Sequence, residues 1–184
     1  MRRALSVLLV SAVAAATAVF SVAPAQAGTI CSKIVIWSRG AGRYVSAEVG
    51  YTGSNYGMLR ARASTIGAWE RFEICQNFGS VPGGAIFWTS LKSLANNRYV
   101  SADWNQSGSL DGMLRAGWAT SIGPWEQFQW DTGNVGDAEI LSLSSMYYVS
   151  AELSPTYPHF QMLRARATQL GSWERFDAYA APSP

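Results

Sequence analysis

Alternating apolar and charged positions predict short strands along most of the chain. Residues 59–63 read Leu-Arg-Ala-Arg-Ala, which places the leucine and the alanines on one face of a strand and the arginines on the other. Residues 163–167 repeat these letters without a change. A further apolar alternation opens each of three units: Ile34 and Ile36, Thr89 and Leu91, Ala138 and Ile140. We therefore expect an all-β chain with four strands in each unit.

The strand pattern is part of a sequence motif that occurs three times, at 44–72, 99–128 and 148–176. Each copy reads Tyr-Val-Ser-Ala-acid, then nine residues, then Met-Leu-Arg-Ala, and ends on Gly-x-Trp-Glu-x-Phe. Three blades would not close a propeller, which uses about four to eight. Three four-stranded units that close as a pseudo-threefold β-trefoil fit the period better. The expected repeats run over about 30–78, 84–132 and 136–179.

The second copy has one residue more before its Trp-Glu step, and a glycine, Gly117, stands near the insertion. Glycine reaches positive φ without a steric cost, so the pattern predicts a β-bulge at this point.

The motifs Val-Ser-Ala-Glu, Leu-Arg-Ala and Ile-Gly-x-Trp-Glu-x-Phe resemble the repeats of the fascin-like, actin-cross-linking β-trefoil superfamily, in its secreted bacterial form. The resemblance covers nearly all residues after 28, and the Gln-x-Trp signature of ricin-B-type trefoils is absent. It implies the trefoil fold and two partner classes, actin and polysaccharide. Many bacterial relatives follow Val-Ser-Ala-Glu with an Asn-Gly-Gly type turn, where this chain has Val49-Gly50. A ligand site therefore cannot be transferred residue by residue.

The first residues have the pattern of a signal peptide. Arg2 and Arg3 precede an uncharged run over 4–20, and Ala25-Gln26-Ala27 is the small-x-small pattern that signal peptidase cleaves. The run is shorter than the ~20 residues that span a bilayer. We expect residues 1–27 to be removed by ordinary secretion, which leaves an extracellular, single-domain chain of residues 28–184.

Without this leader the chain is neutral, because 12 basic residues remain against 12 acidic ones. This balance disfavours nucleic acid and membrane surfaces as partners and favours a neutral one. We also expect a monomer. Cys31 and Cys75 flank the strands of the first copy, and in an oxidising compartment they are expected to form a disulfide.

Threefold recurrence of charged residues indicates architecture, because a catalytic acid pair needs two different environments. We expect ion pairs between strands from these positions, and we expect Trp69, Trp125 and Trp173 to close one end of the barrel as core residues. The only histidine, His159, has no nucleophile motif beside it. No Cys/His cluster or calcium loop occurs in the sequence. We therefore expect a non-enzyme without metal or cofactor. The recurring charged positions are Glu48, Asp103, Glu152, Arg60, Arg115, Arg164, Glu70, Glu126 and Glu174.

The copies differ most in the nine-residue loops between the second and third strands, and binding residues gather on loops of rigid scaffolds. Aromatic rings there suit the apolar face of a pyranose, beside carboxylates or amides that bond its hydroxyl groups. Trp104 beside Asp103, with Trp118 on the next strand, is the constellation that we favour, and we expect Trp104→Ala to weaken binding without unfolding the barrel. The full candidate set is Trp104, Asp103, Asn105, Trp118, Tyr51, Tyr56, Tyr157 and His159.

The sequence thus predicts a secreted, lectin-like module that binds a neutral polysaccharide or glycan. Two alternatives stay open: these aromatics pack as local loop cores, or the chain binds a protein as an actin-type cross-linker or protease inhibitor.

Overall fold

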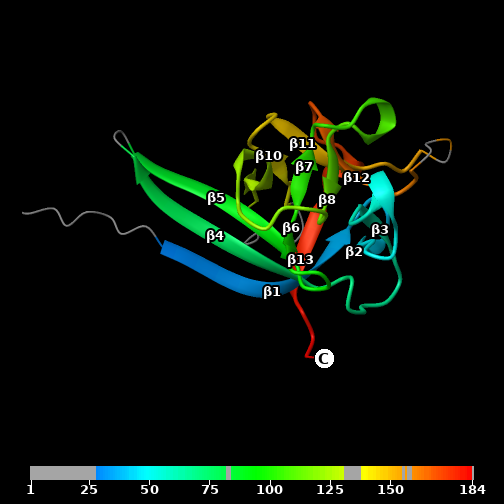
Figure 1. Cartoon of the computed structure of the whole chain (residues 1–184), viewed down its shortest axis with the longest axis horizontal. Coiled ribbons are helices and arrows are strands. Elements are labelled where there is room, and N and C mark those ends of the chain that lie inside the picture. Colours follow the sequence, from blue (N-terminus) through cyan, green and yellow to red (C-terminus); the bar gives the residue numbers. More distant parts are fainter. Residues whose placement is uncertain (1–27, 82–83, 131–137, 155, 157–158, 184) are drawn as a thin grey trace, which may run out of the picture.

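The computed structural model describes residues 28–81, 84–130, 138–154, 156 and 159–183 (Figure 1). The expected signal peptide and Tyr157 lie outside these residues. The described part contains strands and three-residue 3-10 helices only, so none of its helices could traverse a lipid bilayer.

In each repeat the first and last strands pair with strands of the barrel, and the middle strands pair with each other as a hairpin. The first repeat holds β1 (Gly28–Ser38), β2 (Arg43–Ala47), η1 (Gly53–Asn55), β3 (Leu59–Ala63) and β4 (Phe72–Val81). The second holds β5 (Gly84–Ser93), β6 (Arg98–Tyr99), β7 (Ser101–Asp103), η2 (Gly108–Leu110), β8 (Met113–Arg115), η3 (Pro124–Glu126) and β9 (Phe128–Gln129). The third holds β10 (Leu141–Ser142), β11 (Tyr147–Ala151), β12 (Leu163–Ala167), η4 (Ser172–Glu174) and β13 (Phe176–Ala180). The predicted four strands per repeat are present, and the second strand of repeat two is split into β6 and β7.

The first and last strands of the repeats form a barrel. Strands pair in the order β1-β4-β5-β9-β10, and β13 pairs with β1. The backbone N–H of Phe176 donates to the carbonyl of Ala138 at 2.9 Å, which joins the two ends of this order. The barrel encloses a core of apolar side chains that includes Ile36, Phe72, Leu91, Phe128, Ile140 and Phe176. This is the β-trefoil architecture that the repeats predict.

The middle strands of each repeat form hairpins that meet at the pseudo-threefold axis. Three backbone hydrogen bonds of 2.8 Å link them in a ring: Ala61 N–H to Gln161 O, Ala116 N–H to Gly57 O, and Ala165 N–H to Gly112 O. The methionines of the Met-Leu-Arg-Ala motif, Met58, Met113 and Met162, are buried together beside this ring. The leucine that follows each of them packs into the barrel core. Each copy of the motif therefore supplies one methionine to the cluster at the axis and one leucine to the barrel core.

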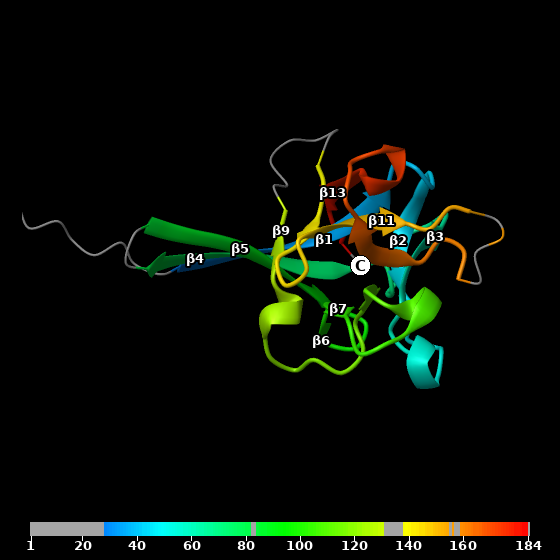
Figure 2. The ribbon, with the colours of Figure 1, turned by 90° about the horizontal axis from the view of Figure 1, so that it is seen from above.

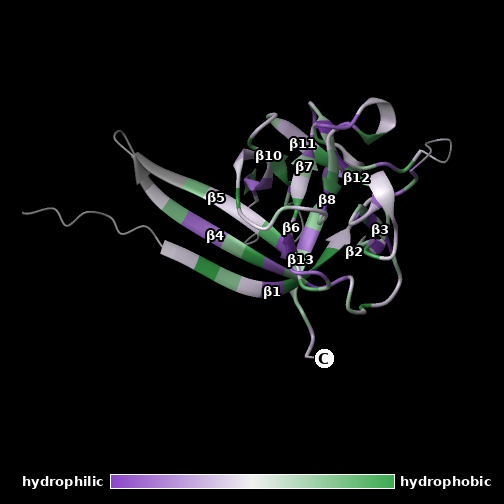
Figure 3. Ribbon diagram, viewed as in Figure 1, coloured by the Kyte–Doolittle hydropathy of each residue, from purple (hydrophilic) through white to green (hydrophobic). Residues whose placement is uncertain are grey.

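One part of the sheet leaves the barrel. The first half of β1 pairs with β4, and β4 pairs with β5 along its whole length, so these strands form an arm that projects to one side (Figures 1 and 2). Hydrophobic residues continue from the barrel along the arm (Figure 3). Phe78 and Phe87 face each other there with ring centroids 5.4 Å apart, and both are exposed, as is Ile30.

The disulfide predicted from the sequence lies on this arm. Cys31 and Cys75 are direct partners in the antiparallel β1-β4 register, with Cα atoms 4.1 Å apart, and they are bonded.

The expectation for the Trp-Glu tryptophans is wrong. Trp69 is 38 % exposed, and Trp125 and Trp173 are only partly buried. The glutamate of each pair turns inward instead, because its carboxylate accepts a hydrogen bond from the glycine N–H three residues earlier, as Glu70 does from Gly67 at 2.7 Å. The phenylalanine two residues later fills the core position. This turn, which is a 3-10 helix in repeats two and three, therefore directs the indole outward.

Candidate functional site

Ion pairs tie the recurring acids to the hairpins in repeats one and three. Arg62 binds Glu48 through Nε and Nη2, both at 2.5 Å, and Arg166 binds Glu152 with the same two nitrogens. Both glutamates are buried. These contacts confirm a structural role for the recurring acids.

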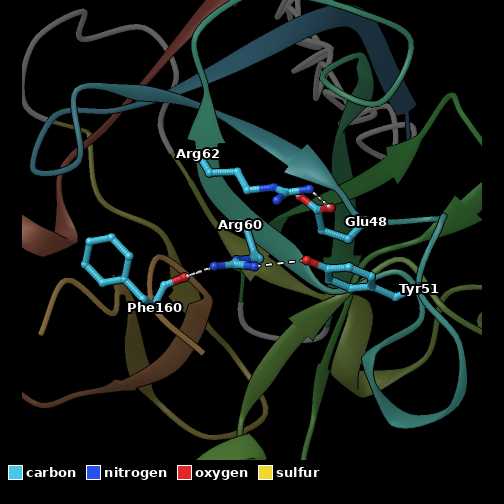
Figure 4. A network of polar contacts seen from close by, with 5 residues as sticks. All are labelled: Glu48, Tyr51, Arg60, Arg62 and Phe160. Carbon is cyan, nitrogen blue, oxygen red and sulfur yellow. Dashed lines mark hydrogen bonds and ion pairs between the residues drawn. The ribbon is translucent and has the colours of Figure 1, made fainter. Parts of the chain in front are cut away.

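The first arginine of each Leu-Arg-Ala motif has a different task in these repeats. Arg60 donates from Nε to the carbonyl of Phe160 at 3.0 Å and from Nη1 to the hydroxyl of Tyr51 at 3.0 Å (Figure 4). The guanidinium of Arg62 also lies near the Tyr51 ring. Tyr51, a candidate ligand residue, is therefore tied into a network that joins repeat one to repeat three.

Repeat two departs from this plan. Gly117 occupies the place of Arg62 and Arg166, and Arg115 turns inward to donate to Asp103 from Nη1 at 3.0 Å. A Cβ atom at Gly117 would lie 2.7 Å from Nε of Arg115, so glycine is needed to leave room for the guanidinium. Strand β8 ends at Arg115, so Gly117 lies outside the β7–β8 ladder and the bulge predicted at this point is wrong.

The segment after β8 in repeat two carries an exposed aromatic surface. Trp118 follows Gly117 directly and is 67 % exposed. The guanidinium carbon of Arg115 lies 5.2 Å from the centroid of its ring, within the range of a cation–π contact. Tyr56, from the loop of repeat one, lies beside it with ring centroids 5.5 Å apart. Two sequence-predicted candidates from different loops are therefore brought together.

A groove of about 510 Å³ opens beside Trp118. Its walls come from the end of β7, the following loop, the segment after β8 and the Trp-Glu turn of η3. Of the candidate residues, Asp103, Asn105 and Trp118 line it. Sequence reasoning missed the others, although the run of small hydroxyl residues after Trp118 was a visible signal. The additional lining residues with polar or aromatic side chains are Ser101, Gln106, Arg115, Thr120, Ser121, Trp125 and Glu126.

The two carboxylates of the groove already have protein partners. Asp103 accepts from the backbone N–H of Asn105 at 3.0 Å and from Gln106, in addition to Arg115. Glu126 accepts from the N–H of Gly123 at 2.7 Å and from Ser101 Oγ at 2.5 Å. The two carboxylates, Ser101 and Gln106 are therefore held in place beside the indole of Trp118.

Trp104 does not lie where a ligand-binding residue of this groove would lie. It is partly buried, packs against the barrel core, and lies with its ring centroid 5.9 Å from that of Tyr147. A Cβ atom at Gly112 would lie 3.0 Å from its ring, so the indole also covers that turn. It does not appear among the residues that line the groove.

His159 is also apart from the groove. It is partly buried, and this burial, together with the positive charge of Arg60, lowers its pKa below the ordinary value of 6.5. In the residues that the structure describes, no group of three His, Cys, Asp or Glu side chains is placed to hold a metal ion.

The first repeat carries a smaller groove at the equivalent place, about 370 Å³. Ser46, Arg62, Thr65, Trp69 and Glu70 are among its lining residues. The Trp-Glu turn thus forms one wall of a surface groove in both repeats, whereas only repeat two adds an indole from the segment after the third strand.

Comparisons with known proteins place the fold. The structure is similar to a designed threefold-symmetric protein, ThreeFoil, with a TM-score of 0.57 over 81 % of this chain and 99 % of that chain. It is also similar to the BEL β-trefoil in an apo crystal form, with a TM-score of 0.55 over 80 % of this chain and 91 % of that chain. This chain is a β-trefoil. The sequence identities are 10 % and 13 %, so the likeness concerns the trefoil fold alone. No family model and no curated protein sequence matches the chain.

Proposed function

We propose that this trefoil is a secreted, non-catalytic module that binds a neutral carbohydrate in the groove of its second repeat. The observation that carries the proposal is the indole of Trp118, which is 67 % exposed at the rim of a groove lined by hydroxyl and amide side chains.

The chemistry of the groove suits a sugar ring. The C–H face of a pyranose is apolar and packs on a flat indole, and Tyr56 extends that aromatic surface. Asn105, Gln106 and Thr120 offer donors and acceptors for the hydroxyl groups at the ring edge. Ordered polar groups beside an aromatic platform bind a ligand with little loss of side-chain entropy.

The proposal includes secretion of the chain and its membership of the fascin-like superfamily. The leader pattern over residues 1–27 and the disulfide are compatible with an extracellular protein. The repeat motifs support membership of the fascin-like superfamily in its secreted bacterial form. Neutral side-chain charge after residue 27 supports an uncharged partner.

The test is a glycan and polysaccharide screen on residues 28–184 with the disulfide intact. We expect this domain to co-sediment with at least one insoluble polymer among glucan, xylan and chitin, and we expect Trp118→Ala to reduce the bound fraction. Failure to retain any glycan would contradict the proposal. Release of reducing sugar by the purified domain would contradict its non-catalytic part.

A second candidate function is protein binding, as in an actin-type cross-linker or a protease inhibitor. The exposed apolar residues of the arm, Ile30, Phe78 and Phe87, favour it, because apolar side chains gathered on a projecting surface often mark an interface. Co-sedimentation with actin filaments, or stoichiometric inhibition in a protease panel, would support this candidate.

A further inference from the structure

Arg115 has two nitrogens without a hydrogen-bond partner although the side chain is only 3 % exposed. Nη1 donates to Asp103, but neither Nε nor Nη2 has an acceptor among the described residues. Arg62, in the first repeat, donates from both of these atoms to Glu48. A buried donor that lacks its acceptor destabilises the fold, more so when the group is charged, so the difference between the two repeats needs an explanation.

The local sequence accounts for the two open donors. Asp103 is shorter by one methylene than the glutamates of the other repeats, and its oxygens are also engaged by Asn105 and Gln106. Gly117 lets the guanidinium of Arg115 lie against its backbone, where a Cβ atom would be 2.7 Å from Nε and 3.1 Å from Nη2. The indole of Trp118 lies against the same guanidinium. Nε and Nη2 are closed off from solvent in this arrangement, and because the indole of Trp118 is 67 % exposed, it can tilt outward to admit an acceptor and still offer its face to the ligand.

The charges of the groove indicate which acceptor fits. Asp103 and Glu126 supply two carboxylates against the single guanidinium of Arg115, so the groove carries a formal charge of minus one. A ligand carboxylate would meet like charge in a partly desolvated place, which is unfavourable. A neutral carbonyl oxygen accepts hydrogen bonds well and brings no charge.

We propose that the second-repeat groove selects a sugar that carries an N-acetyl group, whose carbonyl oxygen accepts from Nε and Nη2 of Arg115. The acetyl methyl group then packs on the indole of Trp118. This inference rests on the proposed carbohydrate function and names the sugar class for that same groove. Repeat one lacks the selectivity, because Glu48 already occupies both donors of Arg62.

The test compares β-1,4-linked oligosaccharides of equal length by isothermal titration calorimetry on residues 28–184. We expect oligomers of N-acetylglucosamine to bind at least tenfold more tightly than oligomers of glucose, and oligomers of glucuronic acid to bind most weakly. Equal affinity for the first two ligands would overturn the inference while leaving the carbohydrate function in place. Absence of binding to all three, together with a negative polymer screen, would remove both.

Two variants locate the preference on Arg115. Gly117→Ala places a methyl group 2.7 Å from Nε of Arg115, so the guanidinium must shift and the ratio of the two affinities should fall toward one, with glucose oligomers still bound. Arg115→Met removes the donors and should have the same effect if circular dichroism shows that it folds. The matched control is Arg62→Met in repeat one, which should leave the ratio unchanged. A preference that persists in folded Gly117→Ala and Arg115→Met would overturn the assignment.

Discussion

The rings of Tyr56 and Trp118 lie with their centroids 5.5 Å apart although the two residues belong to different repeats. Tyr56 ends the loop before β3, and Trp118 follows β8. The isolated bridge between Met58 and Arg115 joins these two segments at the pseudo-threefold axis. The pair of rings beside the candidate groove is therefore a product of hairpin packing, and it differs from the constellation around Trp104 that the sequence favours.

Replacing Trp118 by alanine should weaken glycan binding at least tenfold, which corresponds to about 1.4 kcal/mol. The melting temperature should change little, because most of this side chain is exposed. Calorimetry with a bound oligosaccharide and a thermal melt of the same sample check both parts. Trp69→Ala is the matched control in the first repeat, and it should preserve the affinity of the second-repeat groove. An unchanged affinity in Trp118→Ala would exclude this indole from the site.

Trp104→Ala should mainly lower stability, contrary to the expectation from sequence. The indole packs on the barrel core and against Tyr147, so its removal leaves a cavity that costs about 2–3 kcal/mol, somewhat less than for a fully buried tryptophan. Urea unfolding measures the loss. If stability is unchanged while binding is lost, Trp104 is a ligand residue after all.

Gly57 and Gln161 take equivalent places in the ring of hydrogen bonds at the axis, and we expect their substitutions to change the stability in opposite directions. Gly57 has φ of +74°, and a Cβ atom there would lie 2.3 Å from the carbonyl oxygen of Ala116. Gly57→Ala should therefore cost at least about 2 kcal/mol, since strained φ and a clash with backbone add. Gln161 has φ of +69° without being glycine. Gln161→Gly should stabilise the fold by about 0.5–1 kcal/mol, because the left-handed strain is relieved. Denaturant midpoints of the two variants should move in opposite directions.

Opening the disulfide should destabilise the domain by up to about 4 kcal/mol, because Cys31 and Cys75 close a loop with a sequence separation of 44. The double variant Cys31→Ser/Cys75→Ser avoids reductant during urea unfolding. The outer half of β1 is exposed and its pairing is with β4, so we expect its amide hydrogens to exchange faster in this variant than those of the barrel. Uniform exchange rates across the chain would contradict local release of the arm.

His159 should make stability fall in mild acid. Burial and the charge of Arg60 lower its pKa in the folded chain below 6.5, so the unfolded chain binds the proton first as the pH falls. The stabilisation is complete above about pH 6.5 and is lost between that value and the lowered pKa. Unfolding free energies of the wild type and His159→Gln at pH 7.5 and pH 5.5 test this. The variant should lose less stability over this interval, and equal losses would contradict the assignment.

The sequence determined the trefoil because its evidence is repetitive and local. Apolar alternation fixes which face of each strand is buried, and three near-identical copies require equivalent surroundings, so the recurring acids had to be structural. The pairing of Cys31 with Cys75 followed from strand order within one repeat.

Tertiary structure decided the site, because the site depends on side-chain directions and on contacts between repeats. The glutamate of each Trp-Glu pair bonds the preceding glycine and directs the tryptophan outward, which alternation alone does not reveal. The spacing of Arg115 matches that of Arg60, yet Arg115 turns inward because Gly117 leaves the space that Arg62 fills elsewhere. Sequence spacing predicts a strand and the face on which a side chain lies. The partner of a long side chain such as Arg115 depends on the room left by its neighbours in the folded chain.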